Sequence, residues 1–117
     1  MADCIFCRIV LGELPSRKLY EDDAVLAFHD IHPVAPVHFL IVPKRHIESL
    51  AVLSESDIDV MGRIMVLTGK LAREQGSPNG FRTIVTTGPV GRQDVMHVHV
   101  HVVGGSEVLP PMIVRKG

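Results

Sequence analysis

A run of alternating histidines and valines constrains the fold of this chain more than any other feature. Residues 97–103 read His-Val-His-Val-His-Val-Val. Strict alternation with β-branched residues predicts a β-strand, and residues two apart in a strand share one face. We therefore expect a histidine strand at about residues 95–103. The three imidazoles would line one face, about 6–7 Å apart, while the valines enter a core.

Composition and charge limit the class of protein. The 117 residues are 46% hydrophobic and 21% charged, which is typical of one globular domain over residues 1–117. A net charge of −1 argues against a nucleic-acid partner or an anionic membrane surface. No apolar run approaches the length of a transmembrane helix, and the N-terminal residues do not resemble a signal peptide. We expect a cytoplasmic protein in which Cys4 and Cys7 stay reduced.

The order of the expected elements indicates an α+β fold. They are, in chain order, a short helix within 4–14, strands at 17–21, 24–30 and 38–43, a helical turn at 44–50, one long helix at 54–75, and strands at 81–87 and 95–103. Because strands and helices do not alternate regularly, we expect a mainly antiparallel sheet of about five strands. The C-terminal tail, residues 106–117, is apolar but contains Pro110 and Pro111, so it cannot be a helix interior. Such a tail needs a surface to cover, and a second subunit is one candidate.

The histidine strand allows three interpretations. Its imidazoles could bind a metal such as Zn, Cu, Fe or Ni. One imidazole could instead act as a nucleophile while its neighbours transfer protons and balance charge. The strand could also present an inert polar face. The glycine-containing loop at residues 88–94 favours the nucleophile, because backbone N–H groups in such a loop can surround a phosphate.

Several stretches of the chain resemble the histidine triad superfamily. Residues 97–103 match its signature of three histidines alternating with apolar residues. Agreement continues, in the same order from about residue 4 to residue 105, at residues 5–10, 12–16, 20–23, 27–31, 35–47 and 101–105. In these stretches the chain is similar to the Hint branch, the purine nucleoside phosphoramidases. The resemblance implies an HIT-like fold with one long helix and a short N-terminal helix.

The resemblance also implies an activity, the hydrolysis of purine nucleoside 5′-phosphoramidates of the adenosine 5′-monophosphoramidase type. His99 would attack the α-phosphorus and form a nucleotidyl-histidine intermediate that water then hydrolyses. His101 would lie at the phosphate, and His38 matches a fourth histidine behind the triad.

A nucleotide pocket follows from the same resemblance. Asp30 matches the carboxylate that binds the ribose hydroxyls, which suits a charged acceptor. The base would lie in an apolar slot formed by Phe6, Ile9, Phe28 and Ile31.

The loop beside the phosphate departs from the family pattern. Gln93 agrees with the family, but Thr86 stands where Asn is common, Arg92 where Gly is common, and Asp94 where some members have Ser. The side chain of Asp94 would repel a phosphate, although its backbone N–H could still bind one. Arg92 would attract the phosphate or cap the pocket. These departures leave the reaction class intact and leave the leaving-group preference open.

Cys4 and Cys7 form a C-x-x-C pair, a pattern shared by metal sites, redox sites and chance occurrences. A zinc site needs two more ligands. Some bacterial-type members of the superfamily carry a Cys2His2 zinc, and the resemblance implies that the ligands here are Cys4, Cys7, His46 and His97. His97 would then have a structural role, and no organic cofactor is expected.

Other functions remain open at this point. A dinucleoside polyphosphate hydrolase would share the nucleophile and change only the leaving group. A nucleotide-sensing or regulatory protein would bind nucleotide with incidental turnover, and a metal-dependent enzyme would use the three histidines as ligands. The resemblance also implies a homodimer, with the long helix and the tail at its interface.

Overall fold

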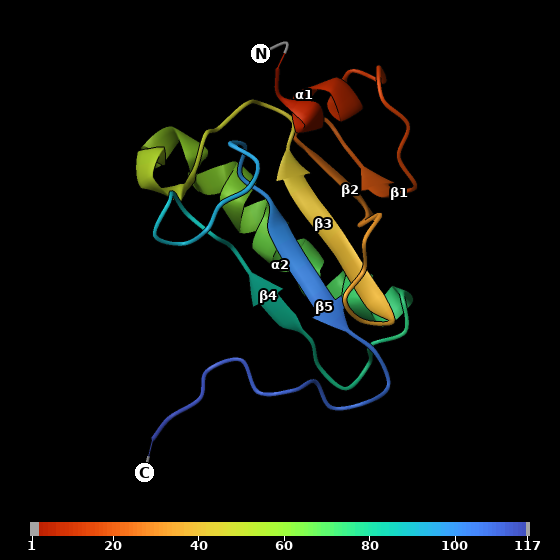
Figure 1. The fold of residues 1–117 in the computed structure, drawn as a ribbon. Coiled ribbons are helices and arrows are strands. Elements are labelled where there is room, and N and C mark those ends of the chain that lie inside the picture. The colour runs from red at the N-terminus through yellow and green to blue at the C-terminus, as the bar shows by residue number, and fades with distance from the viewer. Residues whose placement is uncertain (1–2, 117) are drawn as a thin grey trace.

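The computed structural model describes residues 3–116, which form one antiparallel sheet flanked by helices (Figure 1). Within these residues the sheet order is β1-β2-β3-β5-β4. The strands are β1 (Lys18–Glu21), β2 (Val25–His29), β3 (Val37–Pro43), β4 (Arg82–Ile84) and β5 (Val100–Gly104). The helices are α1 (Ile5–Val10) and α2 (Ile58–Glu74), with short 3-10 turns at Leu50–Val52 and Glu55–Asp57. The expected α+β fold, with about five antiparallel strands, one long helix and a short N-terminal helix, is confirmed.

Helix α2 covers one face of the sheet (Figure 1). The 3-10 turn Glu55–Asp57 leads directly into α2 and begins with a capping box, in which the Ser54 backbone N–H donates to Asp57 Oδ2 at 2.9 Å. The buried side chains of α2 recur at helical spacing: Ile64, Leu67, Thr68, Leu71 and Ala72. They pack on the apolar side chains of the central strands, which are Val25, Ala27, Phe39, Ile41, Val100 and Val102. Within residues 3–116, no helix combines the length and apolar character needed to cross a membrane.

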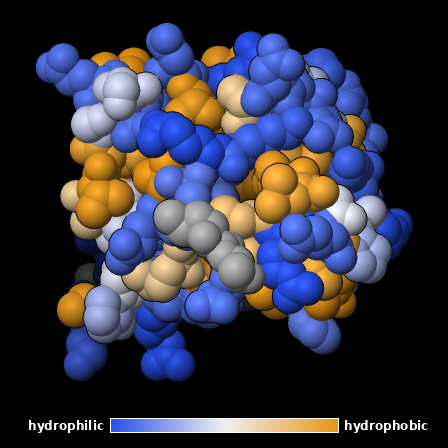
Figure 2. Space-filling view, turned by 90° about the horizontal axis from the view of Figure 1, so that it is seen from above, coloured by the Kyte–Doolittle hydropathy of each residue, from blue (hydrophilic) through white to orange (hydrophobic). Residues whose placement is uncertain are grey.

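The opposite face of the sheet is covered by α1. Phe6 packs there against Leu26, Phe28, Leu40 and Val42. Seen from the α1 end, the surface mixes hydrophilic residues with hydrophobic patches (Figure 2).

The register of the two central strands decides which side each histidine faces. Val100 pairs with Ile41, and His101 pairs with Leu40. Because alternate residues point to opposite faces, the valines enter the core beneath α2 while His101 lies on the α1 side. Val100 and Val102 are fully buried, as the alternation predicts.

Several element boundaries differ from the expected ones. Strand pairing in β5 begins at Val100, not near residue 95, because the backbone N–H of His97 donates to the Val95 carbonyl in a tight turn. Val98 N–H then donates to the Ile47 carbonyl at 2.7 Å. That contact lies in residues 44–49, which form no helix, so the predicted turn at 44–50 is wrong apart from the start of Leu50–Val52. β4 is also shorter than the predicted strand at 81–87.

The tail leaves the sheet after Gly104 and contains no helix or strand up to residue 116 (Figure 1). Arg82 Nη2 donates to the Pro110 carbonyl at 2.8 Å. Val108, Ile113 and Val114 are each more than three-quarters exposed. The tail therefore presents apolar side chains that this chain does not cover itself.

Candidate active site and metal centre

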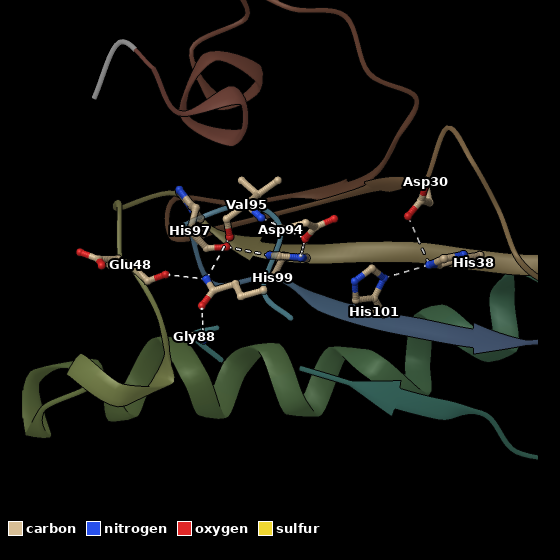
Figure 3. Close-up of polar contacts among 10 residues, drawn as sticks. Asp30, His38, Glu48, Gly88, Asp94, Val95, His97, His99 and His101 are labelled. Atoms are coloured by element: carbon tan, nitrogen blue, oxygen red, sulfur yellow. Dashed lines mark hydrogen bonds and ion pairs between the residues drawn. The ribbon is translucent and has the colours of Figure 1, made fainter. Parts of the chain in front are cut away.

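The histidines gather between α1 and the sheet, on the face away from α2 (Figure 3). The ring centres of His99 and His101 are 5.1 Å apart, and Phe6 of α1 packs edge-on against His99 at 5.0 Å. The tight turn before β5 places His97 beside α1, and the strand itself carries His101. One short segment thus supplies imidazoles to two adjoining clusters.

His99 is buried and held in one orientation. Its Nδ1 lies 2.8 Å from the carbonyl oxygen of His97. A carbonyl can only accept, so Nδ1 carries the proton in this bond. Nε2 points the other way, 3.3 Å from Oδ1 of Asp94 (Figure 3). The backbone therefore leaves Nε2 as the reactive nitrogen.

A hydrogen-bonded chain orients His101. The Val34 backbone N–H donates to His38 Nδ1 at 3.1 Å, so His38 carries its proton on Nε2. His38 Nε2 lies 3.0 Å from His101 Nδ1 and 3.3 Å from Asp30 Oδ2. His101 Nδ1 is then an acceptor, which leaves an N–H at its Nε2. Burial and the neighbouring His99 and His38 lower the pKa of His101, which favours its neutral form.

The side chains of Asp30, Asp94, His99 and His101 border a cavity of about 400 Å³. Its lining brings together Phe6, Ile9, Phe28, Asp30, Ile31, Asp94, His99 and His101, all of which the sequence analysis singled out for the site. The cavity has an apolar end between α1 and β2 and a polar end at the histidines. A volume of this size suits a small organic ligand.

Three residues that the sequence analysis places at the phosphate loop are not part of this cavity's lining. Within residues 3–116, the lining of this cavity does not include Thr86, Arg92 or Gln93. It does include His29 and His32, to which the sequence assigns no role in the site. Burial, with a smaller effect from Arg17, lowers the pKa of His29. No motif in the sequence points to these two histidines, because only the fold brings the end of β2 to the cavity.

Gln93 supports the loop instead. Its Nε2 donates to the Glu48 carbonyl at 2.8 Å and to the Val95 carbonyl at 2.9 Å. Its Oε1 accepts from the Gly88 N–H at 2.9 Å. The preceding residue, Arg92, has a left-handed backbone with φ of 62°. Gln93 therefore fixes the turn that delivers Asp94 to His99.

A second cluster lies at the start of α1. One donor atom from each of Cys4, Cys7, His46 and His97 lies within 4.8 Å of the others. Nδ1 of His97 is 3.3 Å from Cys4 Sγ and 3.5 Å from Cys7 Sγ, and Nδ1 of His46 is 3.3 Å from Cys7 Sγ. The sulfur–nitrogen edge of a tetrahedral zinc site is about 3.5 Å. The donor set and its spacing are thus compatible with a tetrahedral metal.

The protonation of this cluster also suits a metal. His97 Nε2 donates to the Pro43 carbonyl at 2.8 Å, so its Nδ1 lone pair faces the sulfurs. Burial lowers the pKa of His97 and keeps it neutral. Burial and the adjacent Cys4 raise the pKa of the Cys7 thiol to about 11. A bound cation would reverse that shift, because the thiolate is the ligand.

Comparison with known proteins identifies the family. The family model described as the HIT domain matches residues 11–108. A 14 kDa zinc-binding protein of Brassica juncea is 43% identical over 108 residues, covering 91% of this chain and 96% of the relative. The chain therefore belongs to the HIT domain family, which confirms the resemblance to the histidine triad superfamily.

Solved structures agree. A histidine triad protein of Clostridium difficile superimposes with a TM-score of 0.88 at 45% identity, covering 96% of this chain and 98% of that one. A HIT family hydrolase of Legionella pneumophila gives a TM-score of 0.87 at 38% identity, covering 93% and 98% of the two chains.

Proposed function

We propose that this protein hydrolyses purine nucleoside 5′-phosphoramidates through a nucleotidyl-histidine intermediate on His99. The observation that carries the proposal is the hydrogen bond from His99 Nδ1 to the His97 carbonyl. It directs Nε2 toward the polar end of a cavity of nucleotide size. The similarity to the Legionella protein, titled a HIT family hydrolase, supports the reaction class.

In the first step, Nε2 of His99 attacks the α-phosphorus and the P–N bond breaks. The amine leaves with the electron pair of that bond and takes up a proton. His101 faces the phosphate with its Nε2–H, and the link to His38 can relay the proton. In the second step, water attacks phosphorus, the bond to Nε2 breaks, and the nucleoside monophosphate is released.

The remaining lining accounts for nucleotide binding. The base enters the apolar end beside Phe6, Phe28 and Ile31. Asp30 faces the ribose, and its Oδ1 already accepts the His32 backbone N–H at 2.8 Å. Each carboxylate oxygen has a second lone pair, so a ribose hydroxyl can still donate to Asp30.

We also propose a structural zinc held by Cys4, Cys7, His46 and His97. The name of the Brassica relative, a zinc-binding protein, supports this assignment. The ion would tie α1 to the segments after β3 and before β5, which positions the backbone carbonyl of His97 for His99. It would take no part in the reaction.

Purified protein incubated with adenosine 5′-phosphoramidate tests the reaction, with AMP release followed by chromatography. We expect turnover, and we expect folded protein to keep it in the presence of a chelator. Turnover that disappears with the metal while the fold is retained would favour a catalytic metal. Tight binding without turnover would favour a nucleotide-sensing protein, and cleavage of dinucleoside polyphosphates alone would favour the related hydrolase.

We further propose a homodimer formed through α2 and the tail. On α2, Ile58 and Val66 are 65% and 78% exposed, and the tail adds further exposed apolar side chains. Light scattering at micromolar concentration is expected to give twice the mass of the chain. Val66→Glu, which places a charge on the apolar face, should shift the protein toward a monomer. A wild-type monomer under these conditions would contradict the proposal.

A further inference from the structure

The carboxylate of Asp94 lies where the proposed reaction needs a phosphate. Its Oδ1 accepts the backbone N–H of Val95 at 2.9 Å and lies 3.3 Å from His99 Nε2 (Figure 3). Phosphorus must approach that same nitrogen before a bond can form. A phosphate oxygen and this carboxylate oxygen therefore compete for one position.

Asp94 is free to leave this position. Its side chain is 76% exposed, whereas that of His99 is 3% exposed. Rotation of the carboxylate toward solvent would free both the Val95 N–H and Nε2 for a substrate. The negative charge would still remain next to the phosphate after the rotation, because the backbone of the loop is fixed by Gln93.

Other charges at the cavity reinforce this effect. Its lining includes the carboxylates of Asp30 and Asp94 but, within residues 3–116, no lysine or arginine. The carboxylates of Asp3 and Glu48 line an adjoining cavity of about 640 Å³ and not the one that contains His99. Arg92 is exposed and does not line either cavity among the described residues.

Building on the proposed function, we propose that Asp94 discriminates between bound nucleotides by phosphate charge, favouring the monoanionic phosphoramidate substrates over the dianionic nucleoside monophosphate products. A phosphoramidate monoester has one acidic P–OH group and carries a charge of −1. A phosphate monoester has a second pKa near 6 and approaches −2 at neutral pH. Repulsion by Asp94 is stronger against the second anion, so the same carboxylate also weakens binding of the product.

Calorimetric titration at pH 7.5 with two probes tests this inference. The probes are AMP, a dianion, and the methyl ester of AMP, a monoanion. Asp94→Asn should tighten AMP binding by about tenfold and methyl ester binding by about threefold, because the lost repulsion scales with ligand charge. Glu48→Gln makes the same change in net charge, but Glu48 does not lie beside His99. This control should therefore change either affinity by less than about twofold.

Equal tightening of AMP by Asp94→Asn and Glu48→Gln would overturn the inference, because bulk charge would then explain the effect. The inference would also be overturned if Asp94→Asn changed the affinity for both probes by the same factor. Failure of both probes to bind to the wild type and to Asp94→Asn would overturn it as well. Turnover of adenosine 5′-phosphoramidate by the wild type is measured in parallel. Its absence would contradict the proposed reaction alone, because the charge-dependent binding is measured without turnover.

Discussion

Replacing His99 with alanine is expected to lower the rate of phosphoramidate hydrolysis by at least about 10³-fold. The proposed route forms a covalent bond to Nε2, and the described site offers no second imidazole in an equivalent position. His101 is bonded at Nδ1 to His38 and presents an N–H at Nε2, so it cannot substitute as the nucleophile. The measurement is kcat at saturating adenosine 5′-phosphoramidate.

A second variant separates chemistry from folding. His99 is buried, so alanine leaves a void beside Phe6. His99→Asn retains an amide that can donate to the His97 carbonyl but lacks a nucleophilic nitrogen. We expect it to fold with a stability close to the wild type and to be as inactive as His99→Ala. Activity above about a tenth of the wild type in either variant would exclude His99 as the nucleophile.

Loss of zinc is expected to lower the free energy of unfolding by at least about 3 kcal/mol. The proposed ligands join α1 to two loops that are otherwise distant in the sequence. Without the ion, two thiols remain packed against imidazoles, and α1 is held mainly by Phe6 and its apolar neighbours. Urea unfolding with and without a chelator measures the difference, and elemental analysis gives the zinc content.

Cys7→Ser provides the matched control, because it removes one ligand while keeping a small polar side chain. It should hold less than one zinc per chain, and its stability should not respond to the chelator. A wild-type protein that binds one zinc per chain but unfolds at the same urea concentration after chelation would contradict a structural role.

The alternating pattern of the histidine strand and the order of the expected elements together predicted most of the observed fold. Alternation in residues 97–103 correctly predicted that the valines face the core and that His101 faces away from it. The predicted start of the long helical segment at residue 54 is also correct, since Ser54 caps that segment in the structure. Both features depend on residues close together in the sequence, so local rules suffice to interpret them.

The parts that sequence did not predict depend on long-range packing. The chain makes a tight turn at Val95, which shortens β5, and the Val98 N–H then donates to the carbonyl of Ile47, a residue far away in the sequence. Likewise, His29 reaches the cavity only because β2 lies beside β3. The approach of Asp94 to His99 depends on the left-handed backbone of Arg92 and on three hydrogen bonds of Gln93. Residue spacing in the sequence does not predict either feature.

The covalent intermediate is the central claim, and rapid quenching followed by mass spectrometry tests it directly. Wild-type protein mixed with excess adenosine 5′-phosphoramidate and quenched during turnover should gain the mass of one adenylyl group, located by peptide fragmentation on His99. An adenylyl group on another residue, or turnover with no covalent adduct in a burst-phase experiment, would contradict the account.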